Sequence, residues 1–211
     1  MRLYSFFASS AAFRVRIALN LKGVDYETVA VNLSQGEHRG AEFLATNPQA
    51  TVPVIDDDGV VLWQSLAIID YLDSRYPTPR LIPAEPVARA RVQALAQLIV
   101  CEIHPLNNLR VRNYLSQELH LDAEAQSRWY RHWIAEGFAS LEAQVKNFSG
   151  GRYCCGDAVS VADVCLVPQV YNARRFDCDL TPYPTLVRIA DGLRAEPAFA
   201  RAAPELQPDA V

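Results

Sequence analysis

Hydrophobic positions in the first eighty residues switch between the spacing of strands and that of helices. Over residues 11–22, the apolar side chains of Phe13, Ile17 and Leu21 are four positions apart, which predicts a helix. Residues 26–33, YETVAVNL, alternate in polarity and are rich in β-branched side chains, which is typical of a strand. The same patterns predict further strands over residues 2–6, 51–56 and 60–63, and further helices over 38–48 and 65–76.

The order of these elements indicates a small mixed sheet. Two strands separated by a helix form a parallel pair through a right-handed crossover. The sequence DDDG at residues 56–59 joins two short apolar runs and predicts an antiparallel hairpin. We therefore expect the chain to begin with an α/β domain.

The remainder of the chain is helical in pattern and follows a proline-rich segment. Residues 77–86, PTPRLIPAEP, hold four prolines, which suits a semi-rigid linker at a domain boundary. Ser160 and Asp163 fit a capping box before an almost wholly apolar segment, which predicts a buried helix. We expect the C-terminal PELQPDAV to be loose. The predicted helices cover 87–117, with a bend near Pro105, and 123–147, 160–176 and 184–194.

Composition and charge narrow the class of protein. Half of the residues are hydrophobic and the net charge is −4, with acids and bases spread evenly, so nothing favours nucleic acid as a partner. No apolar run approaches the roughly 18 residues that a membrane span needs, and no secretion signal is evident. Five cysteines without a C-x-x-C pair indicate free thiols, and no spacing fits a zinc site. These features predict a cytoplasmic globular protein without a metal.

Two serine positions at predicted helix starts could carry chemistry. Ser9 and Ser10 precede the first helix, and Ser65 opens another after Gln64. A helix N-terminus offers unpaired N–H groups and a partial positive charge, so each serine either caps its helix or helps to bind an anion. The Val52-Pro53 bond is either an ordinary trans bond at a strand start or a cis bond that turns the Val52 backbone toward a ligand.

Several blocks of the sequence resemble the zeta class of glutathione transferases. SSAAFRVRIAL at residues 9–19 is similar to a motif of the form S-S-C-S-x-R-V-R-I-A-L. NPQATVPVI, QSLAIIDYL, YPTPRLIP, ADVCLVPQVYNARRF and DLTPYPTL are also similar to segments of that class. The resemblance covers nearly the whole chain. It implies a thioredoxin-like α/β domain over residues 1–80 that binds glutathione, and an all-helical domain over 87–211 that binds the substrate.

The motif departs from the class at Ala11 and Ala12, where the class has cysteine and serine. A mechanism that needs a protein thiol at this helix start is therefore excluded. The resemblance then implies a glutathione-dependent cis–trans isomerase of maleylacetoacetate or maleylpyruvate, between which the sequence does not choose. The alternative is a general glutathione transferase or a dehalogenase of small halo acids. The class also implies a homodimer.

The resemblance assigns roles to individual side chains. Ser9 is the first choice to contact the glutathione sulfur and Ser10 the second, while the rival Tyr4 is expected to pack in the sheet. Arg175 is preferred to Arg174 as the arginine that faces the substrate, and Asp163 is assigned to capping. The implied cofactor-binding residues are Ser9, Ser10, His38, Val52, Gln64, Ser65, His104 and Asn108, with His104 and Asn108 expected on one face of a single helix.

Arginines are expected to bind the carboxylates of the substrate, because the planar guanidinium can grip a carboxylate with two hydrogen bonds. The candidates are Arg14, Arg110, Arg112, Arg174 and Arg175, of which Arg14, Arg110 and Arg175 are assigned to the substrate. The alternative for each is a solvated charge on a helix surface.

Overall fold

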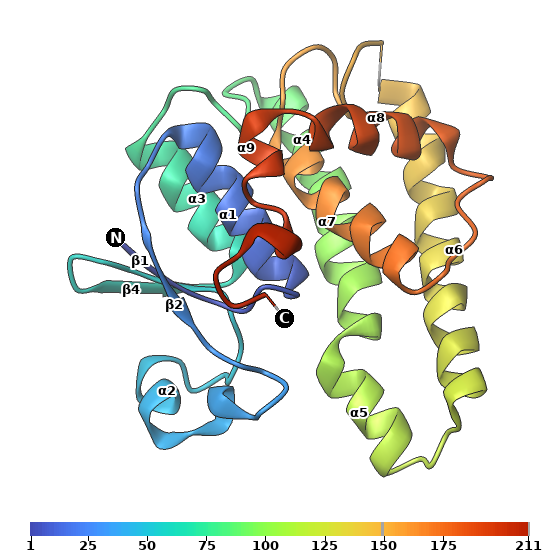
Figure 1. Cartoon of the computed structure of the whole chain (residues 1–211). Helices are drawn as coiled ribbons and strands as arrows, with labels where there is room; N and C mark the ends of the chain where they lie inside the picture. Colours follow the sequence, from blue (N-terminus) through green and yellow to red (C-terminus); the bar gives the residue numbers. More distant parts are fainter. Residues whose placement is uncertain (149, 211) are drawn as a thin grey trace. The chain divides into compact units, whose positions relative to one another are not determined.

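The computed structural model in Figure 1 describes residues 1–148 and 150–210. The chain divides into two compact units. The first contains Met1–Arg80 together with Arg194–Val211, and the second contains Leu81–Leu193. By packing, the C-terminal segment thus belongs with the first unit, although the sequence assigned it to the helical domain.

A four-stranded mixed sheet forms the centre of the first unit. Its strands are β1 (Arg2–Ser5), β2 (Glu27–Ala30), β3 (Val54–Asp57) and β4 (Val60–Trp63), in the order β2-β1-β3-β4. Strands β1 and β2 are parallel, and the β1–β3 and β3–β4 pairs are antiparallel, which confirms the predicted sheet. The helical elements of this unit are α1 (Ser10–Lys22), η1 (Glu37–Arg39), α2 (Ala41–Thr46), α3 (Ser65–Arg75), α9 (Pro197–Ala200) and η4 (Pro204–Leu206).

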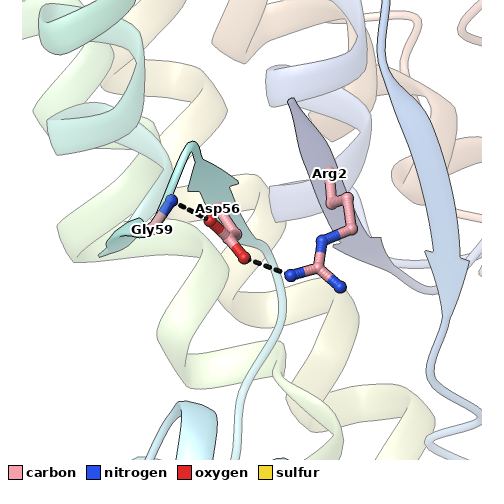
Figure 2. Close-up of polar contacts among 3 residues, drawn as sticks. All are labelled: Arg2, Asp56 and Gly59. Carbon is pink, nitrogen blue, oxygen red and sulfur yellow. Dashed lines mark hydrogen bonds and ion pairs between the residues drawn. The ribbon is translucent and has the colours of Figure 1, made fainter.

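The turn between β3 and β4 is held to the neighbouring strand by Asp56 (Figure 2). One carboxylate oxygen of Asp56 accepts a hydrogen bond of 2.8 Å from the Gly59 N–H, and the other pairs with the Arg2 guanidinium of β1. The Gly59 hydrogen bond, followed by that from Arg2, lowers the pKa of Asp56. The predicted hairpin is therefore present, and its first acidic residue ties it to β1.

Helix α1 is buried along most of its length, with ten of its 13 residues buried. It ends at Gly23, whose φ of 63° lies in the left-handed region that glycine adopts readily. The buried residues include Arg14 and Arg16, which are 1% and 0% exposed. The alternative that Arg14 is a solvated surface charge is therefore wrong.

The second unit is made of helices. They are α4 (Pro86–Gln97), the π-helical segment η2 (Leu98–Ile103), the 3₁₀ segment η3 (His104–Asn107), α5 (Leu109–Gln117), α6 (Ala123–Phe148), α7 (Val161–Arg175) and α8 (Pro184–Arg194). The predicted helix over 87–117 is thus broken rather than merely bent at Pro105. Helix α6 packs tightly against the π-helical segment, because a Cβ at Gly137 would lie 2.2 Å from the side chain of Ile103.

The capping box before α7 is present as predicted. The Asp163 carboxylate accepts hydrogen bonds from the Ser160 N–H and the Cys154 N–H, both 2.9 Å long. The Ser160 hydroxyl donates a third hydrogen bond of 2.7 Å. Asp163 is fully buried, so this carboxylate has a structural role at the start of a central helix.

Residues 204–210 of the C-terminal tail make defined hydrogen bonds, which differs from the predicted loose end, while Val211 lies outside the described residues. Asn20 of α1 donates a hydrogen bond of 2.9 Å to the Ala198 carbonyl. The Gln207 side chain donates to the carbonyls of Arg201 and Ala203 at 3.0 and 2.8 Å. These side-chain bonds to distant or irregular backbone leave no periodic signal in the sequence.

A buried ion pair joins α1 to α3. The Lys22 ammonium lies 2.6 Å from an Asp73 carboxylate oxygen, and the two side chains are 0% and 4% exposed. The ammonium also donates to the carbonyl of Pro79. Each charge is compensated, and the removal of one partner would leave a buried charge without its counter-ion.

We predict that Lys22→Met lowers the free energy of unfolding by about 3–5 kcal/mol in urea denaturation, because Asp73 is left uncompensated. The double variant Lys22→Met/Asp73→Leu should recover part of this loss. Arg128→Gln is the control, since it breaks an exposed pair with Glu124 and should cost less than about 1 kcal/mol. Equal stability of the Lys22→Met and wild-type proteins would contradict this account of the pair.

Candidate functional site

The first group of candidate residues lies where β1 passes into α1. Ser9 is the N-cap residue of α1, and its hydroxyl oxygen accepts a hydrogen bond of 3.2 Å from the Ala12 N–H. The capping role of Ser9 is thus confirmed, and it leaves the hydroxyl proton available to an anion. Ser9 is half-buried, whereas Ser10 is only 5% exposed. Ser9 is therefore the more accessible hydroxyl at this helix start.

The peptide that leads into Ser9 is held by the buried guanidinium of Arg16. Its Nη2 donates to the Phe7 carbonyl at 3.0 Å, and its Nη1 donates to the Ser5 hydroxyl at 3.1 Å. Its Nε donates to the Ala202 carbonyl in the C-terminal tail, also at 3.0 Å. A single cation therefore joins the end of β1, the loop before Ser9 and the tail.

The tail supplies a second contact to the same loop. A carboxylate oxygen of Asp209 accepts a hydrogen bond of 2.8 Å from the Phe7 N–H. The Phe7 residue, two positions before Ser9, is thus fixed at its N–H by Asp209 and at its carbonyl by Arg16. These contacts could not be predicted from the sequence, in which the only local signal is that two arginines interrupt an apolar helix.

The start of α3 contains the other predicted serine. Ser65 is 4% exposed, and its hydroxyl accepts a hydrogen bond of 3.3 Å from Nη1 of Arg14. The N-cap position is Gln64, with φ of 69°, so the alternative that Ser65 caps the helix is wrong. Arg14 brings a positive charge to the N-terminus of α3, where the helix dipole adds to it. Its burial favours this role over direct contact with a substrate.

Polar side chains lie near Gln64, and in the same stretch of the chain the backbone groups of Val52 have no hydrogen-bond partner among the described residues. The Gln64 amide donates to the side-chain oxygen of Gln49 at 2.9 Å, and the Thr51 hydroxyl donates to the same oxygen at 3.3 Å. The Val52-Pro53 bond is cis, so the trans alternative is wrong. Neither the N–H nor the carbonyl of Val52 has a hydrogen-bond partner among the described residues. The Val52 peptide thus retains both groups that could pair with an extended ligand.

Two further predicted residues lie in this unit. The Tyr4 ring packs against Phe43 with centroids 6.1 Å apart, in a cluster with Val52 and Val54, which confirms its packing role. His38 belongs to the 3₁₀ segment η1, and burial, with a smaller effect of Arg39, lowers its pKa. Both effects therefore disfavour the charged form of the His38 ring.

The second group of candidates lies in the helical unit and consists of arginines. Arg174 forms a two-pronged ion pair with Asp191, with N–O distances of 2.6 and 2.9 Å. Arg175, the next residue, is exposed, and its guanidinium carbon lies 5.7 Å from the ring centroid of Phe176. The preference for Arg175 over Arg174 is supported by this difference. Arg110 is also exposed, in the first turn of α5.

His104 and Asn108 do not share a helix face, so that prediction is wrong. His104 begins the 3₁₀ segment, and Asn108 is the N-cap residue of α5. The Asn108 side-chain oxygen accepts a hydrogen bond of 3.1 Å from the Arg110 N–H. The break around Pro105 changes the angular position of every residue after it. Asn108 therefore has a structural task as a cap.

Three features bear on what the site can contain. Among residues 1–148 and 150–210, no group of three or more histidine, cysteine or acidic side chains could hold a metal ion. No helix within these ranges is both long and apolar enough to cross a membrane. The first unit offers two helix N-termini, the Ser9 hydroxyl and the free Val52 peptide, a donor set that fits a peptide with anionic groups.

Comparison with known proteins identifies the family. The family described as "Glutathione S-transferase, N-terminal domain" matches residues 1–74. The probable maleylacetoacetate isomerase of Vibrio cholerae is 55% identical over 210 residues, which cover 99% of this chain and 97% of the relative. A holo structure titled as maleylpyruvate isomerase, a bacterial zeta-class glutathione transferase, is 47% identical with a TM-score of 0.98 and full coverage of both chains.

A third relative was crystallised with ligands. The maleylacetoacetate isomerase of Methylobacterium extorquens AM1, solved with malonate and GSH bound, is 44% identical with a TM-score of 0.93, again over the whole of both chains. The chain belongs to the glutathione transferase family, in its zeta class. The resemblance that the sequence motifs indicated is therefore confirmed.

We predict that Asp209→Ala loosens the loop before Ser9. The loss of a hydrogen bond to a charged group should speed amide hydrogen exchange at Phe7 by roughly tenfold or more. The exchange rate can be measured by NMR, with Glu205→Ala, an exposed change in the same tail, as the control. Equal exchange at Phe7 in the two variants would show that Asp209 does not hold the loop.

Proposed function

We propose that this protein is a glutathione-dependent cis–trans isomerase that acts on maleylacetoacetate or maleylpyruvate. The principal support is the full-length similarity to relatives with these two names, at 55% and 47% identity. The donor set of the first unit is consistent with glutathione as the cofactor. When bound, glutathione would supply a thiolate that could add to one alkene carbon, so that the former double bond becomes a single bond free to rotate, and elimination of the thiolate would restore the alkene.

Ser9 has the first role in this mechanism. Its hydroxyl proton is available because capping uses only a lone pair of the oxygen. The N-terminus of α1 adds a partial positive charge at the same place, and both effects favour a thiolate over a thiol. Ala11 and Ala12 offer no thiol, so the protein contributes no nucleophile there. Ser10 is the second choice, because it is nearly fully buried.

The remaining parts of glutathione are assigned to other residues of the first unit. We propose that the γ-glutamyl end is bound by Gln64 and Ser65, where Arg14 contributes positive charge. The free peptide of Val52 is proposed to pair with the cysteinyl backbone. His38 is a weaker candidate for the glycyl end. His104 and Asn108 remain candidates from the helical unit, although the capping task of Asn108 reduces its freedom.

Arginines are proposed to bind the carboxylates of the substrate and to stabilise the negative charge that develops on the conjugated carbonyl. Arg175 is the main candidate, because it is exposed while its neighbour Arg174 is ion-paired. Arg110 is exposed in the first turn of α5 and is the second candidate. In this proposal most contacts to glutathione come from residues 1–80, with His104 and Asn108 as candidates from the helical unit, and the substrate contacts come from arginines of the helical unit.

The proposed localisation and oligomeric state follow from the composition and from the family. We propose a cytoplasmic homodimer, since the class implies a dimer and five free cysteines suit a reducing compartment. A general glutathione transferase or a halo-acid dehalogenase would use the same thiolate with a different acceptor. The three relatives considered above all carry isomerase names, which favours isomerisation over this alternative.

We predict that the protein isomerises maleylacetoacetate or maleylpyruvate in the presence of glutathione without consuming it. The ultraviolet absorbance of the substrate and the free thiol concentration should be followed together, with each substrate in parallel. Stoichiometric loss of free thiol would indicate conjugation instead. An absorbance change that does not depend on glutathione would contradict the proposed mechanism.

We predict that Ser9→Ala lowers kcat near pH 7 by roughly tenfold, because the pKa of the bound thiol rises by about one unit without the hydroxyl donor. Ser9→Thr is the matched control, since it keeps both the cap and the donor. Ser10→Ala should have a smaller effect. Normal turnover by the double variant Ser9→Ala/Ser10→Ala would show that hydroxyl activation of the thiol is the wrong idea.

A further inference from the structure

The guanidinium groups of two arginines lie over the ring of Phe176, the C-cap residue of α7. The guanidinium carbon of Arg112 lies 4.5 Å from the ring centroid and that of Arg175 lies 5.7 Å from it. Because both distances are measured from one centroid, the two carbons are at most about 10 Å apart. The Tyr130 ring packs on Phe176 with centroids 4.1 Å apart and is 3% exposed. Buried aromatic packing thus fixes the platform over which both cations lie.

The two cations have no acidic partner among the residues that the structure describes. No ion pair within 4.0 Å involves either Arg112 or Arg175, whereas the adjacent Arg174 is paired with Asp191. The first turn of α5, which leads into Arg112, contains no acidic residue, although a helix N-terminus is positive. Burial, and then repulsion by Arg175, lower the pKa of Arg112. Two like charges at most about 10 Å apart therefore lie beside the Phe176 ring, one of them in the first part of α5.

This arrangement costs free energy in the unliganded protein. Like charges repel most strongly where solvent is partly excluded, and Arg112 is only half-exposed. The Phe176 ring compensates only in part through cation–π attraction. An anion that accepts hydrogen bonds from both guanidiniums would relieve the repulsion.

We propose that Arg112 and Arg175 together bind one carboxylate of the substrate over Phe176, with Arg112 as a residue that sets the preference for dicarboxylates. This inference rests on the proposed function for the identity of the substrate, while the anion site itself rests on the side-chain geometry. Arg175 is exposed and gives the carboxylate access. Arg112 is half-buried with its guanidinium over the Phe176 ring, so it loses less freedom on binding. A substrate esterified at that carboxylate loses both contacts.

The test measures the binding of malonate to the full chain by calorimetry at constant ionic strength, without glutathione. Malonate is the dicarboxylate that was crystallised with the Methylobacterium relative. Arg112→Gln should weaken its binding by roughly tenfold or more, the effect of losing a charge-assisted hydrogen bond. Arg112→Lys, which keeps the charge but not the planar fork, should lie between this variant and the wild type. Arg128→Gln, which removes an exposed and paired charge in the same unit, is the control.

Kinetics supply the second measurement. Arg112→Gln should raise KM for the dicarboxylate by a similar factor with little change in kcat, and it should leave KM for the corresponding monoester almost unchanged. Absence of malonate binding by the wild type would overturn the proposal, as would equal effects of Arg112→Gln and Arg128→Gln. If malonate binding depends on Arg112 but no isomerisation occurs, the anion site stands and the proposed function fails. If isomerisation occurs with the same KM in Arg112→Gln and the wild type, the function stands and the role of Arg112 fails.

Discussion

The buried guanidinium of Arg16 holds the peptide from which α1 starts, and the position of Ser9 depends on it. It donates to Ser5 at the end of β1, to the carbonyl of Phe7 and to Ala202 in the tail. A charge that is 0% exposed is tolerated only because its donors are occupied. Together with Asp209, it converts the loop before Ser9 from a free connection into a fixed one. A hydroxyl that must face one sulfur atom needs this kind of support.

The arginines of the chain divide into two kinds by their surroundings. Arg14 and Arg16 are buried and donate to oxygens of the protein, so they build the site in the first unit. Arg112 and Arg175 share an aromatic ring in the helical unit and lack acidic partners among the described residues. The first kind positions hydroxyls and peptides, and the second is suited to bind an incoming anion. Residue type alone does not separate the two kinds, because a guanidinium is charged in both.

Features that depend on local sequence could be predicted from the sequence. Apolar spacing predicted α1, the spacing of Ser160 and Asp163 predicted the capping box, and the DDDG turn predicted the hairpin. The candidate serine at the start of α1 was found because helix N-termini are marked by small polar residues. These signals lie within a few residues of one another, so one sequence is enough to reveal them.

Features that depend on distant contacts could not be predicted. The order of the tail depends on the hydrogen bond between Phe7 and Asp209 at opposite ends of the chain. The break in the predicted helix over 87–117 involves a π-helical segment that packs against Gly137 on another helix. The separation of His104 from Asn108 follows from that break. Each case depends on a partner that local periodicity does not identify.

A crystal structure of this protein with glutathione would test the central claim most directly. We expect the glutathione sulfur to lie within hydrogen-bond distance of the Ser9 hydroxyl, at the N-terminus of α1. A sulfur bound instead beside the Tyr4 hydroxyl, or far from the start of α1, would contradict it.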